Sequence, residues 1–257
     1  MIFETHCHLN DEQFNSDIEE VLLRAKENHI DSLCVVAWDK KSSFDAIKIC
    51  KNYQHLGLKL YPVVGLHPEN VDEETDKDLK WLEEILQCED IIAIGEIGID
   101  LHYTSDNLDL QKYYFDLQLK LAKKYNLPVI IHTRDATQIT YDMVKEYKSE
   151  VFGVFHCYSG SLEMAKLITS LGYKLGIGGV ITFKNSHLGE VVEALDINNF
   201  VCETDCPYLS PVPNRGKRNE PSNLIYVINK MAEIKNMSKN EIEMHTYQNA
   251  KEILRIK

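Results

Sequence analysis

The stretch IFETHCHLN, residues 2–10, decides between the two common parallel α/β folds. Its first part, residues 2–6, is short and apolar, which is typical of a strand buried on both faces. A doubly wound open sheet usually follows its first strand with a glycine-rich turn that binds a nucleotide. Here that turn is HCHLN and contains no glycine. The stretch therefore favours a barrel over an open sheet.

The same alternation of strand and helix continues along the chain. Similar strand patterns cover residues 32–37, 60–65, 91–95, 128–132, 151–156, 173–178 and 200–204. Amphipathic helix patterns cover residues 17–29, 109–125, 161–171, 222–235 and 238–254. Eight strands with helices between them in 257 residues have the number and length of a (β/α)8 TIM barrel. Because no Gly-, Ser- or Pro-rich linker divides the chain, we expect residues 1–257 to form one domain.

The composition, 44% hydrophobic and 26% charged residues, is typical of a soluble globular protein. No stretch approaches the roughly 18 apolar residues of a membrane span, and the first ten residues lack the features of a secretion signal. The seven cysteines include no CxxC pair, and most lie in apolar runs, as in proteins of reducing compartments. We therefore expect a cytoplasmic protein without membrane contact, and the sequence indicates no stable protein partner.

The net charge of −12 excludes a basic coat that binds nucleic acid over the whole surface, although not nucleic acid as a substrate. Between residues 69 and 90, ten acidic residues and two lysines contribute −8 of this charge. We interpret this segment as the solvated face of a helix rather than a partner site. The apolar stripe of that helix would be Leu79, Leu82, Ile85 and Leu86.

Histidines and carboxylates follow the ends of five of the eight predicted strands, where a barrel gathers its functional residues. These candidate metal ligands are His6, His8, Glu96, His132, His156 and Asp205. Six ligands suit two divalent ions: His6, His8 and Asp205 would hold one, His132 and His156 the other, with Glu96 between them. Imidazole and carboxylate suit Mg, Mn or Zn, and also Fe or Co. We interpret His29, His55, His187 and His245 as structural, since none has a carboxylate companion in the pattern.

Seven segments, in order, resemble the TatD family of metal-dependent deoxyribonucleases within the metal-dependent hydrolase superfamily. They are THCHL (5–9), GLHP (65–68), AIGEIGID (93–100), LPVIIHTRDA (127–136), FHCYSGS (155–161), LGIGGVITFKN (175–185) and ETDCPYLSPVPNRGKRNEPSN (203–223). By this resemblance the six candidate ligands match the family's metal ligands. Glu4 and Asn10 depart from the pattern, since Asp is usual at both positions. The resemblance implies a nuclease that trims DNA from its 3′ end.

We therefore predict hydrolysis of phosphodiesters by a water that two metal ions activate. The candidate catalytic residues are Asp205, Glu96 and Glu203. Asp205 would be either a ligand that also orients or deprotonates the water, or a ligand only. Glu203 shares the strand face of Asp205 and would be a partner of a ligand or a proton carrier. DNA ends or short single strands would be the substrate.

Cationic and aromatic side chains near the predicted strand ends are candidates for substrate contacts. The predicted contacts are His67, Arg134, Arg215, Lys217 and Arg218. The guanidinium groups of the arginines suit phosphate, although the basic loop could also be a solvated turn. His67 would either face the substrate or cap the chain next to Pro68. Tyr103, Tyr158, Tyr208 and Phe183 would stack on bases or simply pack.

Two alternatives remain open. One is a related hydrolase of an ester or amide, such as an aminoacyl ester on tRNA. The other is a barrel that binds metal without catalysis. Glu96 speaks against the cyclic-amide and phosphotriester branches, which by resemblance would carry a modified lysine on the fourth strand.

Overall fold

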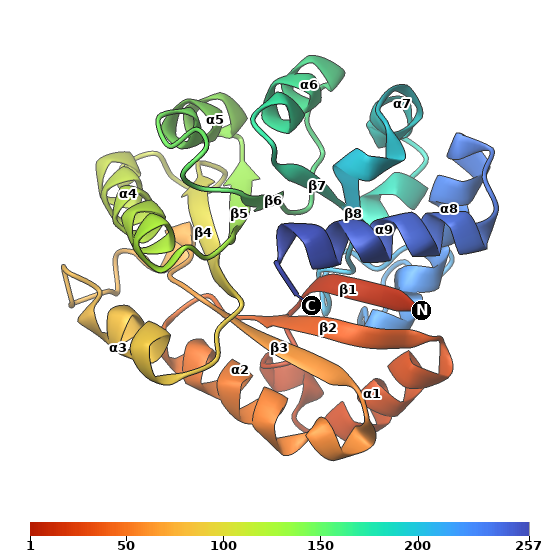
Figure 1. The fold of residues 1–257 in the computed structure, drawn as a ribbon, viewed down its shortest axis with the longest axis horizontal. Coiled ribbons are helices and arrows are strands. Elements are labelled where there is room, and N and C mark those ends of the chain that lie inside the picture. Colours follow the sequence, from red (N-terminus) through yellow and green to blue (C-terminus); the bar gives the residue numbers. More distant parts are fainter. Residues whose placement is uncertain (257) are drawn as a thin grey trace.

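Eight parallel strands, paired in chain order, form the centre of the computed structural model, which describes residues 1–256. They are β1 (Ile2–Cys7), β2 (Ile30–Val36), β3 (Lys59–Val64), β4 (Ala93–Asp100), β5 (Val129–Arg134), β6 (Gly153–Phe155), β7 (Lys174–Ile177) and β8 (Phe200–Cys202). Backbone hydrogen bonds from Asp205 to His6 (3.0 Å) and from His8 to Cys206 (2.8 Å) bring the last strand back to the first. The predicted TIM barrel is thus confirmed (Figure 1).

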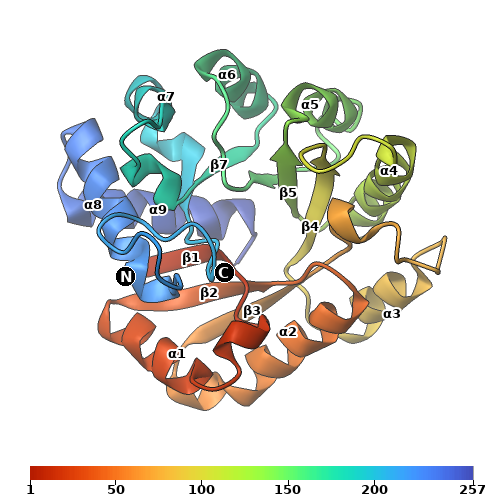
Figure 2. The ribbon, with the colours of Figure 1, turned by 180° about the vertical axis from the view of Figure 1, so that it is seen from behind.

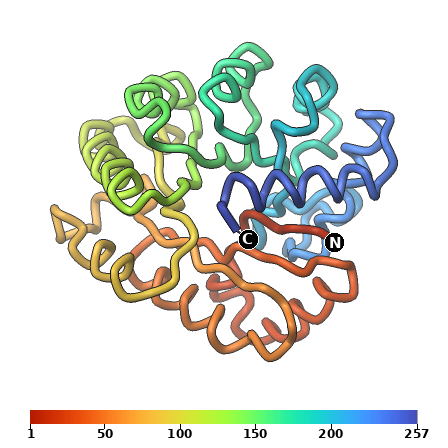
Figure 3. The backbone as a smooth tube through the Cα atoms, viewed as in Figure 1, coloured from red at the N-terminus to blue at the C-terminus, as the bar shows by residue number. Residues whose placement is uncertain are grey.

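Helices surround the strands as an outer ring (Figure 3). They are α1 (Ile18–Glu27), α2 (Lys40–Asn52), α3 (Lys80–Cys88), α4 (Leu108–Tyr125), α5 (Thr137–Lys145), α6 (Leu162–Ser170), α7 (Leu188–Ala194), α8 (Leu224–Lys235) and α9 (Lys239–Ile253). Side chains fix several starts: Ser161 caps α6, and Ser238 forms a capping box with Glu241 at α9. None of the helices in residues 1–256 has the length and apolar character needed to cross a membrane.

The interior of the barrel is closed at one end by α9. Strand residues such as Phe3, Val63 and Val201 fill the interior and form one buried cluster with Ile253 and Leu254 from the end of that helix. In Figure 1, α9 crosses the face of the barrel that is turned toward the viewer. Figure 2 shows the opposite face, where the long connection after β8 lies. Because α9 closes the first face, the second is left free for a site.

Strand β4 is the main departure from the predicted strands, because it extends to Asp100 rather than ending at residue 95. Ile97 and Ile99 are fully buried and continue its apolar pattern. Gly98 permits close pairing with β5: a Cβ there would lie 1.9 Å from the carbonyl oxygen of His132. Glu96 therefore lies inside the strand, and Asp100 occupies its end.

The predicted acidic helix is also shorter than expected, since only residues 80–88 are helical. The acids from Glu69 to Asp78 lie mostly in the preceding loop, while Leu79, Leu82 and Ile85 are buried as predicted. Asp76 and Glu74 accept hydrogen bonds from Trp81, through its backbone (3.3 Å) and its indole (2.9 Å) respectively. Before the helix, the backbone N–H groups of Asp76 and Asp78 donate to the carboxylates two residues earlier, Glu74 (2.7 Å) and Asp76 (3.2 Å). Such local bonds compete with helical hydrogen bonds, so the helix begins late.

Shortening a buried side chain of α9, the helix that closes the barrel, should destabilise the fold. Ile253→Ala removes a buried side chain, so we expect the free energy of unfolding to fall by about 2–4 kcal/mol in urea denaturation. The control is Met244→Ala on the same helix, whose side chain is exposed, with an expected change within about 0.5 kcal/mol. Equal stability of the two variants would contradict the role of α9.

Candidate metal centre

The carboxyl ends of the strands place the six predicted ligands around one pocket. His6 lies in β1 and His8 just after it, Glu96 in β4 and His132 in β5. His156 and Asp205 directly follow β6 and β8 and complete the set. Five of the six line a pocket of about 740 Å³, and His6 lies fully buried beneath it. The structure therefore brings together all six side chains that the sequence singled out.

Glu96 lies between two pairs of histidines. Its Oε2 lies 3.4 Å from His6 Nε2 and 3.5 Å from His8 Nε2. Its Oε1 lies 2.7 Å from His132 Nδ1 and 2.6 Å from His156 Nε2. One carboxylate thus turns each of its oxygens toward a different pair of imidazoles.

Asp205 completes the first of these groups. Its Oδ1 lies 3.4 Å from His8 Nε2 and 3.7 Å from His6 Nε2. The two imidazole nitrogens themselves are only 3.2 Å apart, which places two ring nitrogens and two carboxylates around one point. His132 Nδ1 and His156 Nε2 are likewise 3.2 Å apart beside Glu96. Such convergence of imidazole and carboxylate, without thiolate, fits divalent metal ions.

The charges in the pocket also suit a cation. Burial, reinforced by His156, lowers the pKa of His6, so its ring remains neutral and can act as a ligand. Burial alone would raise the pKa of Glu96, but the surrounding histidines outweigh this and hold that pKa well below its usual value. Asp205 behaves similarly: hydrogen bonding to His8 and the nearby imidazoles lower its pKa despite burial. Both carboxylates are therefore ionised near neutral pH.

Hydrogen bonds behind the ligands fix the orientation of their rings. His8 Nδ1 lies 2.9 Å from the carbonyl oxygen of Val36. His132 Nε2 lies 2.8 Å from Asp100 Oδ2, so its Nδ1 is turned toward Glu96. Partners of this kind set ring orientation and raise the basicity of a ligand. Asp100 is the functional residue that the sequence analysis missed, although residues 96, 98 and 100 share one strand face by the period of two.

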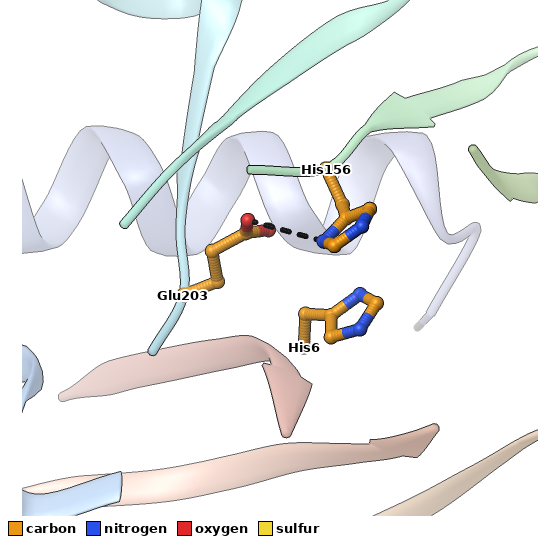
Figure 4. A group of neighbouring side chains, drawn as sticks. All are labelled: His6, His156 and Glu203. Atoms are coloured by element: carbon orange, nitrogen blue, oxygen red, sulfur yellow. Dashed lines mark ion pairs between the residues drawn. The ribbon is translucent and has the colours of Figure 1, made fainter. Parts of the chain in front are cut away.

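Glu203 supports His156 rather than lining the pocket (Figure 4). Glu203 is fully buried. Its Oε1 lies 3.6 Å from His156 Nδ1 and accepts a hydrogen bond from the backbone N–H of Cys157. The rings of His6 and His156 stack with centroids 4.0 Å apart. Possible ligand atoms of His6, His156 and Glu203 lie within 4.8 Å of one another. However, Glu203 lies nearest to Nδ1 of His156, whereas Nε2 of that ring lies beside Glu96. This geometry favours a partner of a ligand over a proton carrier.

The predicted substrate contacts divide into two sets. His67 and Arg134 line the pocket, and His67 Nε2 lies 3.5 Å from Glu96 Oε1. The three basic residues of the connection after β8 do not line it. Arg218 forms two hydrogen bonds with Asp17, at 2.8 and 2.6 Å, and Arg215 lies over the ring of Phe183. Lys217, the third, is exposed.

A (β/α)8 barrel with imidazoles and carboxylates gathered at the carboxyl ends of its strands defines the class of metal-dependent barrel hydrolases. A family model described as TatD related DNase matches residues 3–255. The chain is 42% identical to the uncharacterized metal-dependent hydrolase YabD of Bacillus subtilis (strain 168), over 100% of both chains. The chain therefore belongs to the TatD family of metal-dependent hydrolases, which confirms the resemblance seen in the sequence.

Solved structures agree with this assignment. The crystal structure of YjjV, a TatD homologue from Escherichia coli K12, has a TM-score of 0.92 and 30% identity, and the match covers 100% of this chain and 98% of that one. A TatD family hydrolase from Entamoeba histolytica has a TM-score of 0.86 and 27% identity, with 98% of each chain covered. The shared barrel therefore extends over the whole of the matched chains.

Loss of the carboxylate behind His132 should weaken metal binding. Asp100→Asn keeps the shape of the side chain but removes its charge, so we expect the affinity for Mn²⁺ to fall about 10- to 100-fold in a calorimetric titration. Asp142→Asn, on the exposed surface of α5, provides the control and should bind Mn²⁺ as the unmodified protein does. Unchanged affinity in Asp100→Asn would show that His132 is oriented by other contacts.

Proposed function

We propose that this protein is a deoxyribonuclease that hydrolyses phosphodiester bonds from the 3′ end of single-stranded or short DNA. The position of Glu96 between two histidine pairs supports this proposal, because two adjacent cation sites could share its carboxylate. His6, His8 and Asp205 would hold one divalent ion, and His132 and His156 the other. Mg²⁺, Mn²⁺ and Zn²⁺ all accept such ligands.

Two divalent ions at this centre would supply a water of lowered pKa and neutralise charge on the phosphodiester oxygens. Asp205 is the best placed group to orient that water and take its proton, since it is ionised and lines the open side of the pocket. Asp100 would hold the ring of His132 in position through its hydrogen bond, and Glu203 lies 3.6 Å from Nδ1 of His156. His67, beside Glu96, would face a substrate oxygen.

The size and charge of the pocket favour a strand end as the substrate. A volume of about 740 Å³ lies within the range of small-molecule sites, and Arg134 is the one arginine or lysine that lines the pocket within residues 1–256. Tight binding of a long duplex requires cations that neutralise many phosphates, and a protein of net charge −12 does not provide them.

All seven cysteines are free thiols, in keeping with a protein of the reducing cytoplasm.

Nuclease activity is the direct test. With Mn²⁺ or Mg²⁺, the purified protein should shorten a 5′-labelled single-stranded oligonucleotide from its 3′ end in a gel assay. Glu96→Ala removes the shared carboxylate and should reduce product below detection, whereas Glu84→Ala, at an exposed position of α3, should have no effect. An unmodified protein that leaves DNA intact with every metal but cleaves an aminoacyl ester would refute the nuclease proposal in favour of an ester hydrolase.

Metal stoichiometry is a separate test of the centre. Protein stripped with a chelator and then titrated with Mn²⁺ should bind two ions per chain, and activity should return as they bind. His132→Ala should reduce this to about one ion, because only the group of His6, His8 and Asp205 remains complete. His187→Ala, at an exposed histidine in front of α7, is the matched control. A single ion in the unmodified, fully active protein would contradict the two-ion mechanism.

A further inference from the structure

Arg134, at the mouth of the pocket, has a free guanidinium group. It is exposed, and within residues 1–256 its side chain forms neither an ion pair nor a hydrogen bond. Every other arginine in these residues is engaged: Arg24 by Glu220, Arg215 by Ser210, Arg218 by Asp17 and Arg255 by Asn126. Although the chain has 40 acidic residues, Arg134 pairs with none of them in residues 1–256. Its N–H donors are therefore available for an anion.

The ring of Tyr103 lies beside this guanidinium. Tyr103 is 74% exposed, and Arg134 Cζ lies 5.4 Å from its ring centroid. His102 packs edge-on against the same ring at 4.9 Å and pairs with Asp135 at 2.9 Å. The ring is therefore supported on one side by an imidazole that is itself held, while most of its surface remains open to solvent.

This pair is attached rigidly to the metal centre. The backbone N–H of Leu101 donates to the carbonyl oxygen of Arg134 at 3.0 Å, which joins the ends of β4 and β5. Asp100, next to Leu101, contacts His132, which is two residues before Arg134. Tyr103 and Arg134 thus line the same pocket as Glu96, on the side of the pair His132 and His156.

On the opposite rim of the pocket, Tyr208 lies beside a carboxylate. Tyr208, which follows β8, is half exposed and donates a hydrogen bond to Asp11 at 3.1 Å. Burial raises the pKa of Tyr208 to about 12, and the negative charges of Asp11, Asp205 and Glu69 act in the same direction. Tyr208 is thus already engaged with a carboxylate, whereas Arg134 offers free N–H donors to a phosphate.

We propose that Tyr103 and Arg134 form a subsite for the part of a nucleic-acid strand that continues beyond the scissile bond. The base next to that bond stacks on the open face of Tyr103, and the following phosphate receives the free N–H donors of Arg134. This inference rests on the proposed nuclease function. It implies that the strand leaves the metal centre on the side of His132 and His156, toward Tyr103 and Arg134.

Kinetics on a short single-stranded oligonucleotide test the stacking contact. Base stacking on an aromatic ring is worth enough that Tyr103→Ala should raise KM about tenfold or more while kcat changes by less than about twofold. Tyr103→Phe keeps the ring and should retain the original KM. The control is Tyr113→Ala at an exposed tyrosine of α4 outside the pocket, and it should also retain that KM.

A second variant tests the phosphate contact. Arg134→Gln removes one cation, so the slope of log KM against log salt should decrease by about 0.7, the value for one phosphate contact on a single strand. The control is Lys239→Gln, at an exposed position of α9 outside the pocket, and it should keep the original slope. The small diester methyl p-nitrophenyl phosphate has no neighbouring nucleotide, so its hydrolysis by the unmodified protein reports on the metal centre alone.

The outcomes separate the two proposals. If the unmodified protein cleaves the oligonucleotide but Tyr103→Ala leaves KM unchanged, the subsite is refuted and the nuclease function stands. An increase in KM for Tyr208→Ala instead of Tyr103→Ala would place the strand on the other rim and likewise refute the subsite. Cleavage of neither the oligonucleotide nor the small diester by the unmodified protein would overturn both proposals.

Discussion

The return of the last strand to the first is the constraint on which the site depends. The backbone hydrogen bonds between Asp205 and His6 and between His8 and Cys206 join segments that are about 200 residues apart in the chain. Without them, Asp205 would not meet His6 in β1 and His8 just after it. Glu4, fully buried, strengthens the same junction, because its Oε1 accepts hydrogen bonds from the backbones of His6 (3.0 Å) and Thr204 (2.9 Å). This gives a structural role to the position where the family pattern usually has Asp.

The carboxylates of the pocket create a field that favours positive charge. Hydrogen bonds and charge interactions with Asp205 and Glu96 raise the pKa of His8 against the effect of burial, and Glu96 and Glu203 do the same for His156. When no metal is bound, the raised pKa values favour protons on the imidazoles of His8 and His156. A metal ion must displace these protons, so its affinity depends on pH as well as on geometry.

The sequence predicted the barrel and the six residues of the centre because both follow from local patterns. The strands alternate with helices, and the six candidate ligands lie within the strands or directly after them. The predicted fourth strand ended at Gly95 and so did not include Asp100, whereas β4 continues through Gly98, which permits close pairing with β5. The sequence pattern also pointed to Arg218 as a contact in the pocket. Asp17, which binds Arg218, is about 200 residues away in the chain, and no local pattern reveals such competition.

The positions of the basic side chains determine how a protein of net charge −12 could bind a polyanion such as DNA. Arg215 lies over the ring of Phe183 and Arg218 pairs with Asp17, and neither lines the pocket. In the proposed function, attraction for DNA would come from divalent ions bound beside Glu96 and from Arg134, which lines the same pocket. Since these cations would lie within one pocket, only the few nucleotides that enter it would be attracted. The acidity that disfavours binding along a duplex would therefore leave a strand end as the part of DNA that reaches the centre.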